Sequence, residues 1–166
     1  MTYVCYEVSG ATPDEIRASM DASPSRPRDI HENTFEDALT LWNYHVDWTD
    51  AMSGGACRAT SVTPTVAVSF TFPRWVAPPD PLPATVSRWD AYVAALETHE
   101  KGHEQNGIDA ASDAIIRIRA VSVSDCADFD AAAQAATAAA TADGNAADQR
   151  YDATTDHGAT QGARFP

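Results

Sequence analysis

The apolar residues of this chain change their spacing about halfway along the sequence. In the first half, two segments place large apolar side chains at every second position, as strands with one buried face do. In the second half, apolar residues recur every three or four positions, as on one face of a helix. We therefore predict an α+β fold, with a small antiparallel sheet and one helix followed by a mainly helical half.

The sheet is predicted to contain strands around residues 42–48 and 66–72. Trp42, Tyr44, Val46 and Trp48 alternate in the first strand, and Val66, Val68, Phe70 and Phe72 alternate in the second. Ser53-Gly54-Gly55 predicts a turn between them. Pro64 and Pro73 are expected to bound the second strand, because proline cannot donate to a sheet ladder.

A short helix is predicted after a first strand-like segment at residues 3–8. Thr12 and Glu15 have the spacing of a capping box, which marks a helix start. Ile16 and Met20 would then lie on the same helix face. We expect both side chains to point into the core.

The C-terminal half is predicted to hold a long helix after Pro83 and a second helix from about Asp128 to Ala142. Asp143-Gly144-Asn145 is expected to end the second helix, and residues 151–166 have the turn-rich composition of a disordered tail. An inward-facing stripe with helical spacing marks the long helix: Val86, Trp89, Val93, Leu96, Gly107, Ala110, Ala114 and Ile118.

Length and charge limit the possible classes of protein. A chain of 166 residues fits one domain, here predicted as a mainly β lobe at 1–80 and a helical lobe at 81–166. The net charge of -13 argues against nucleic acid as a partner, because phosphates require basic surface. No apolar run approaches the roughly 18 residues typical of a membrane span, so we predict no membrane insertion.

The three cysteines do not have the spacing of a zinc ribbon. Cys5, Cys57 and Cys126 lie far apart and form no C-x-x-C pair. In an oxidising compartment two of them would pair, and their spacing leaves all three pairings open. The chain opens without a basic segment followed by an apolar stretch, so either it is cytosolic or a leader has been removed.

His99-Glu100-Lys101-Gly102-His103 matches the H-E-x-x-H signature and falls within the long predicted helix. Residues four apart lie on one helix face, so both imidazoles can bind the same zinc ion. Glu100 stands beside the first ligand, where it can take a proton from zinc-activated water. Two hydrogen-bonded core histidines are the alternative, but burying two imidazoles and a carboxylate without a metal is costly. We therefore predict a zinc site.

A catalytic zinc has three protein ligands and one open position. Glu104 lies on a different helix face. Asp109, ten residues after His99, would ligate only if the helix broke before it, yet the helical pattern continues to Ile118. Residue type alone favours a histidine only slightly among the candidates of the tail. These candidates are Asp152, Asp156 and His157.

Residues 97–103 and 151–163 together resemble a bacterial domain of undescribed function whose members are predicted to be secreted zinc-dependent proteases. That family combines an H-E-x-x-H helix with a C-terminal Y-D-x-x-T-x-H-G-x-x-Q-G-A segment, and this sequence has every fixed residue of both. The likeness extends to the strand of Trp42 and Trp48, to Gly-x-Cys at 55–57 and to aromatic-Pro-x-Trp at 72–75. The likeness covers nearly the whole chain. One departure is that the leader expected of a secreted member is absent from this sequence.

The resemblance implies a single zincin-like domain with an ordered tail. It implies zinc ligands at His99, His103 and His157, with Glu100 as the general base. A secreted or periplasmic location is implied as well. Under that condition, a disulfide between Cys57 and Cys126 becomes the expected pairing.

We therefore expect a zinc metallopeptidase acting on a peptide or protein substrate. Glu100 would take a proton from zinc-activated water and return it to the leaving amine. Tyr151 is the candidate for stabilising the oxyanion, or else an aromatic that packs the tail. Asp152 and Asp156 could orient a ligand histidine or simply be solvated.

Two other readings remain open. The same histidines could hold a non-catalytic, zinc-stabilised exported protein, or the chain could be a binding module whose metal is incidental. Glu100 favours the enzyme, because a purely structural zinc needs no carboxylate beside its first ligand. The strand through Val66, Val68 and Phe70 could hold a substrate backbone, although core packing also explains its residues.

Overall fold

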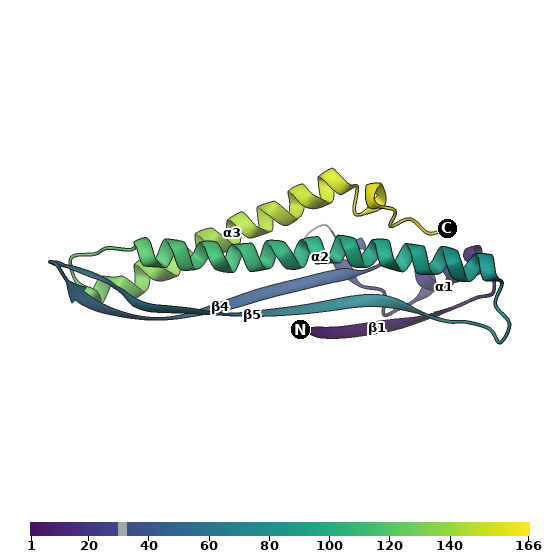
Figure 1. The fold of residues 1–166 in the computed structure, drawn as a ribbon, viewed down its shortest axis with the longest axis horizontal. Helices are drawn as coiled ribbons and strands as arrows, with labels where there is room; N and C mark the ends of the chain where they lie inside the picture. The colour runs from purple at the N-terminus through teal and green to yellow at the C-terminus, as the bar shows by residue number, and fades with distance from the viewer. Residues whose placement is uncertain (30–32) are drawn as a thin grey trace. The chain divides into compact units, whose positions relative to one another are not determined.

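The computed structural model describes residues 1–29 and 33–166 and has the predicted α+β fold. Figure 1 shows the elements in chain order, coloured from the purple N-terminus to the yellow C-terminus. They are β1 (Thr2–Ser9), α1 (Pro13–Ala22), β2 (Arg28–Asp29), β3 (Thr34–Phe35), β4 (Leu39–Ser53), β5 (Ala56–Val76), α2 (Pro83–Ala120), the 3-10 helix η1 (Cys126–Asp128), α3 (Phe129–Thr155) and the 3-10 helix η2 (Ala159–Gln161).

The described residues group into two compact units. We call the first the site unit; it consists of Met1–Leu41, Val68–His103 and Tyr151–Pro166. The second, the disulfide unit, consists of Trp42–Ala67 and Glu104–Arg150. Each unit takes segments from both halves of the chain. The predicted lobes at 1–80 and 81–166 within one domain stay a prediction.

The main sheet is mixed, whereas the sequence predicts an antiparallel one. The strand order is β1-β5-β4, and β1 pairs in parallel with Ser69–Val76 of β5. β4 and β5 are joined at Gly54 and Gly55, whose φ angles of 60° and 83° suit a tight hairpin turn. Apolar spacing has a period of two in parallel and antiparallel strands alike. The direction of β1 was therefore not encoded in that pattern.

β5 is one continuous strand, although the sequence predicts that Pro64 and Pro73 bound it. The parallel pairing with β1 covers only Ser69–Val76, so at Pro64 one side of β5 has no partner strand among the described residues. A missing N–H group is tolerated at such an open side. The predicted inward face is confirmed, because Val68, Phe70 and Phe72 are buried.

α1 begins as the sequence predicts. The Thr12 hydroxyl accepts a hydrogen bond from the Glu15 amide, and the Glu15 carboxylate accepts one from the Thr12 amide at 3.2 Å. This reciprocal capping box satisfies two amides that lack partners within the helix. Ile16 and Met20 are fully buried on the inner face.

The partly buried carboxylate of Asp37 connects several elements of the site unit. Arg17 donates two hydrogen bonds to Asp37, at 2.7 and 2.8 Å, and Arg26 donates a third at 2.8 Å. The Tyr92 hydroxyl donates to the same carboxylate, and the Tyr6 hydroxyl donates to the Asp37 carbonyl at 2.8 Å. Burial acts to raise the pKa of Asp37, but the hydrogen bonds from Arg17 and Tyr92 outweigh it and lower this pKa.

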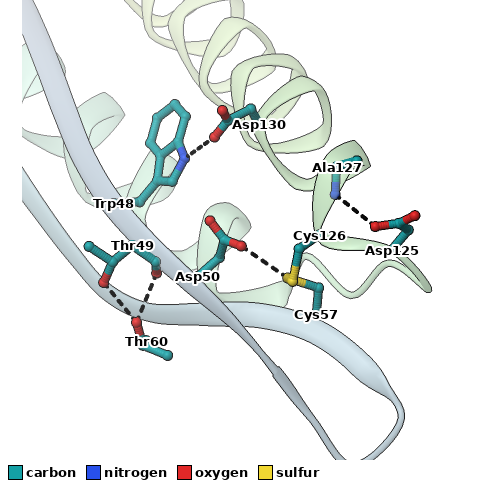
Figure 2. Close-up of a disulfide and its surroundings, with 9 residues drawn as sticks. All are labelled: Trp48, Thr49, Asp50, Cys57, Thr60, Asp125, Cys126, Ala127 and Asp130. Carbon is teal, nitrogen blue, oxygen red and sulfur yellow. Dashed lines mark hydrogen bonds between the residues drawn. A yellow bond between two sulfur atoms is a disulfide. The ribbon is translucent and has the colours of Figure 1, made fainter.

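The disulfide unit is built around the Cys57–Cys126 disulfide that the resemblance implies (Figure 2). Near it, the Trp48 indole donates to the Asp130 carboxylate at 2.8 Å, which attaches β4 to the start of α3. The core of this unit consists of Val46, Cys57, Val62, Ala114, Ile118, Phe129, Ala133 and Ala140. Cys5, the remaining thiol, is exposed.

α3 continues through Gly144 to Thr155, whereas the sequence predicts an end at residues 143–145. A Cβ atom at Gly144 would lie 2.7 Å from the Cβ of Ala110 and 3.0 Å from the Trp42 ring. The glycine therefore permits close helix packing and does not terminate the helix. Across the described residues, no helix combines the length and apolarity needed to cross a membrane.

Candidate metal centre

The two histidines of the H-E-x-x-H motif meet a carboxylate from the end of α3. The Nε2 atoms of His99 and His103 are 3.3 Å apart. Oδ1 of Asp152 lies 3.2 Å from Nε2 of His99 and 3.0 Å from Nε2 of His103. All three side chains are largely buried, with exposed fractions of 6%, 12% and 16%. Three atoms able to bind a metal thus form a nearly equilateral triangle.

Helix geometry explains how these atoms come together. His99 and His103 lie one turn apart on α2, so their side chains project from the same face. Asp152 lies in the last turns of α3, an ordered helix where composition alone predicts a disordered tail. Gly102 lets α3 approach closely, because a Cβ atom there would lie 2.2 to 2.4 Å from the ring of Tyr151.

Tyr151 packs on both histidines. Its ring stacks on His99, with centroids 5.0 Å apart and planes at 11°, and it meets His103 edge-on at 5.2 Å. Its hydroxyl accepts a hydrogen bond from Nε2 of Gln161 at 3.0 Å. These contacts are those of an aromatic that packs the tail. The predicted role in oxyanion stabilisation stays a prediction.

Hydrogen bonds from the tail define the tautomer of His99. Its Nδ1 atom lies 3.1 Å from Oε1 of Gln161 and 3.5 Å from the Thr155 hydroxyl oxygen. The Gln161 oxygen can only accept, so Nδ1 of His99 must carry the hydrogen. Nε2 then presents its lone pair toward Asp152 and His103. This is the arrangement in which a metal-binding histidine is normally held.

A tight turn brings Gln161 back to His99. Asp156, His157 and Gly158 have left-handed φ angles of 51°, 49° and 80°, and the His157 amide donates to the Asp152 carbonyl at 3.0 Å. Such angles are costly for residues with a side chain, so surrounding contacts must hold the turn. At Gly158 a Cβ atom would lie 2.9 Å from the His99 ring.

The C-terminal end of the chain is anchored on α2. Phe165 is 6% exposed and meets Trp89 edge-on, with ring centroids 5.4 Å apart. It also packs on Tyr92, at a centroid distance of 5.0 Å. This aromatic anchor and the contacts at His99 fix both ends of the segment between them. The ordered tail implied by the resemblance is confirmed.

Glu100 is buried beside the triangle, with 3% of its surface exposed. The Thr40 hydroxyl donates a hydrogen bond of 2.6 Å to its Oε2 atom. Burial raises the pKa of Glu100, and the Thr40 hydrogen bond and the neighbouring histidines only partly offset this. Asp152 behaves in the opposite way. Burial acts to raise its pKa, but the hydrogen bond from His103 and the neighbouring imidazole of His99 prevail and lower it.

Asp152, which the sequence places both among the candidate third ligands and among the residues that could orient a ligand, contacts both histidines. His157, the predicted third ligand, has its Nδ1 atom 4.0 Å from Oδ1 of Asp152, and its side chain is 45% exposed. Asp156 is exposed and forms an ion pair with Arg164 at 2.7 Å. The identity of the third ligand stays a prediction at this point.

A family model described as bacterial proteins of unknown function (DUF922) matches residues 3–158. The chain belongs to this family. The searches of curated proteins and of solved structures found no match. The family description assigns neither an activity nor a cofactor, so the chemistry of this member must be argued from its residues.

Sequence reasoning missed three residues of the site in this DUF922 protein. Thr40 lies sixty positions before Glu100, and nothing in the spacing of β4 singles it out. Gln161 and Gly102 belong to the two motifs that carry the resemblance, but their roles become visible only through contacts with His99 and Tyr151. By contrast, Asp109 is exposed on α2 and accepts a hydrogen bond from Gln105. The helix does not break before Asp109, as the helical pattern up to Ile118 predicted.

Proposed function

We propose that this protein is a zinc-dependent hydrolase that cleaves peptide bonds. The observation that carries the proposal is the buried carboxylate of Glu100, held by Thr40 directly beside the histidine pair. A zinc ion that only stabilises a fold needs no buried carboxylate outside its ligand set. A hydrolase does need one, as the base for the attacking water.

The histidine pair fits zinc. Zinc–nitrogen bonds of about 2.0–2.1 Å in a tetrahedral site place two ligand nitrogens about 3.3–3.4 Å apart. The Nε2 atoms of His99 and His103 are separated by 3.3 Å, and the Nδ1 hydrogen of His99 leaves its Nε2 atom available for a metal. A zinc ion bound there supplies Lewis-acid activation of water and of the substrate carbonyl.

The remaining chemistry belongs to residues of this chain. Glu100 accepts a proton from the attacking water and delivers it to the leaving amine. Thr40 fixes the carboxylate in one orientation through its hydrogen bond to Oε2. Tyr151 stacks on the imidazole of His99 and Gln161 accepts the hydrogen of its Nδ1 atom, so together they hold the ring in place.

The substrate and the location are part of the same proposal. The helix signature and the family resemblance support a peptide or protein substrate, and the net charge of -13 argues against nucleic acid as a partner. The Cys57–Cys126 disulfide fits an oxidising environment, which supports a secreted or periplasmic protein.

A non-catalytic zinc protein is the second candidate, and one observation favours it. Asp152 and His157 both lie near the histidine pair, with 4.0 Å between Oδ1 and Nδ1. If both bound the ion, four protein ligands would surround it, as in structural zinc sites. Such a site would have no position left for water.

Zinc content and peptide cleavage, measured together, separate the two candidates. Wild type, Glu100→Gln and Glu97→Gln would be assayed for bound zinc and for cleavage of casein and a mixed peptide library. Glu97 is an exposed glutamate of the same helix and serves as the matched control. We expect one zinc ion per chain in all three proteins, and loss of cleavage by roughly 100-fold or more in Glu100→Gln only. Zinc binding without cleavage by any of them would favour the structural candidate, and equal cleavage by all would refute Glu100 as the base.

A further inference from the structure

The proposed function leaves the third zinc ligand to the tail, and the structure distinguishes its candidates. We propose that Asp152, and not His157, is the third protein ligand beside His99 and His103. This inference rests on the proposed zinc site, and it changes the ligand set from three imidazoles to two imidazoles and one carboxylate.

The first support is distance. The potential ligand atoms of His99, His103 and Asp152 form a triangle with sides of 3.0, 3.2 and 3.3 Å. Zinc–nitrogen and zinc–oxygen bonds of about 2.0–2.2 Å in a tetrahedral site give sides of about 3.3–3.5 Å. The 3.3 Å side lies within this range, and the two sides that involve Asp152 are about 0.1–0.5 Å shorter, so a shift of a few tenths of an ångström would complete one face of a zinc tetrahedron.

The second support is charge. His99 carries its hydrogen on Nδ1, where Gln161 accepts it, so its Nε2 lone pair faces the carboxylate of Asp152. In the neutral imidazole, this lone pair and the carboxylate oxygen repel each other at 3.2 Å unless a cation lies between them. Zinc removes this repulsion, because Nε2 of His99 and the Asp152 oxygen then both bind the same ion.

The third support is the rigidity of the backbone segment that carries each candidate ligand. Asp152 lies within α3, its side chain is 16% exposed, and the stacked ring of Tyr151 precedes it in the chain. His157 lies in the left-handed turn after the helix, and its side chain is 45% exposed. A metal ligand is normally held by packed neighbours in a rigid element, which is the situation of Asp152.

The assignment has a consequence for the reaction. Two imidazoles and one carboxylate fill three positions and leave the fourth open to water, as in catalytic zinc sites. The carboxylate adds one negative charge, so the net charge of this ligand set is one unit lower than that of three neutral histidines. Asp152 thereby completes a catalytic site, and the closed four-ligand arrangement is excluded by the same proposal.

Zinc titration of matched variants tests the assignment without any activity measurement. Asp152→Ala, Asp152→Asn, His157→Ala and wild type would be titrated with zinc against a competing chelator. We expect both Asp152 variants to lose affinity by more than about 100-fold, because loss of an outer partner alone costs 10–100-fold. His157→Ala should lose less than about 10-fold. Asp156→Ala removes an exposed carboxylate four residues along the chain and should leave zinc affinity unchanged.

Circular dichroism and thermal unfolding of the metal-free proteins would show that each variant folds. At one fixed zinc concentration, zinc should then raise the thermal unfolding midpoint of wild type and His157→Ala. It should not raise the midpoint of the Asp152 variants. A loss above about 100-fold in His157→Ala, alone or together with Asp152→Ala, would overturn the proposal. Failure of wild type to bind zinc would instead overturn the proposed function itself, so the two failures are distinguishable.

Discussion

The site unit and the disulfide unit bury different kinds of side chain. The core of the disulfide unit is apolar and contains a covalent cross-link between Cys57 and Cys126. Among the described residues, the buried polar side chains all belong to the site unit: Thr40, Thr85, His99 and Glu100. Apolar burial is favourable by itself, whereas polar burial costs free energy unless each group has a partner.

Backbone strain follows the same division. The residues other than glycine with positive φ angles, within the described ranges, are Asn33, Asp156 and His157, and all three belong to the site unit. Strained angles and buried polar groups persist where function requires them and the surroundings compensate. From this comparison we infer that the disulfide unit contributes mainly to stability, whereas contacts in the site unit hold polar side chains and backbone angles that are individually unfavourable.

The largest expected effect comes from breaking the cross-link of the disulfide unit. Replacing Cys57 and Cys126 by serine removes a link across 69 residues of chain, which the loop-entropy model values at roughly 4 kcal/mol of unfolding free energy. We expect urea denaturation to show a loss of this size and zinc titration to show none. Cys5→Ser, at an exposed thiol, is the control for the substitution itself. A parallel fall in zinc affinity would show that the two units do not divide these tasks.

The second largest effect is expected from Asp37→Asn in the site unit. Arg17 and Arg26 would lose their shared carboxylate, whose side chain is 18% exposed, and removing one partner from a buried ion pair costs about 3 kcal/mol or more. Asp90→Asn, at an exposed aspartate of α2, should change the unfolding free energy by less than about 0.5 kcal/mol.

The same carboxylate predicts how stability depends on pH. The pKa of Asp37 is lower in the folded protein than in the unfolded chain, where an aspartate titrates near about 3.9. Its contribution is therefore complete above the unfolded pKa and is lost as pH falls through the lower folded pKa. Denaturation measured from neutral to acidic pH should show wild type losing this stability and Asp37→Asn lacking that component. A difference between them that stays constant down to the lowest pH would contradict the assignment.

Local patterns predicted the elements well, and contacts between distant segments account for what they missed. The capping box at Thr12 and Glu15, the alternation in β4 and β5 and the stripe on α2 each depend on a few adjacent residues, and the structure confirms them. The parallel direction of β1 and the continuation of α3 through Gly144 depend on partners far along the chain. No window of neighbouring residues contains that information.

The candidate site divides in the same way. His99, Glu100 and His103 were predictable because one helix turn determines their relation. The position of Asp152 depends on where α3 ends and on the contact between Tyr151 and Gly102, which residue types do not reveal. The candidates of the tail stay a prediction, but its backbone angles decide which side chain faces the histidines.

A smaller effect is expected from Gln161→Leu, which removes the acceptor at Nδ1 of His99. Loss of such an outer partner typically costs 10–100-fold in metal affinity, or about 1.4–2.7 kcal/mol. Zinc titration should show this loss, while urea denaturation of the metal-free protein should change little. Gln134→Leu makes the same replacement at an exposed position of the disulfide unit and should affect neither quantity. Unchanged zinc affinity in Gln161→Leu would mean that Nδ1 of His99 needs no fixed partner.

The smallest effects come from adding one methyl group at a helix glycine in each unit, and they separate the units most sharply. Alanine favours a helix by about 1 kcal/mol over glycine, but a forced contact costs about 1–3 kcal/mol, so a net loss near 1 kcal/mol is expected in each case. Gly102→Ala must displace the Tyr151 ring, whereas Gly144→Ala must displace Trp42 or Ala110. Both should therefore lose stability in urea, but only Gly102→Ala should weaken zinc binding, because Tyr151 packs on both histidines. Equal loss of zinc affinity in Gly144→Ala would show that a packing change in the disulfide unit affects zinc binding. The proposed division of tasks between the two units would then be wrong.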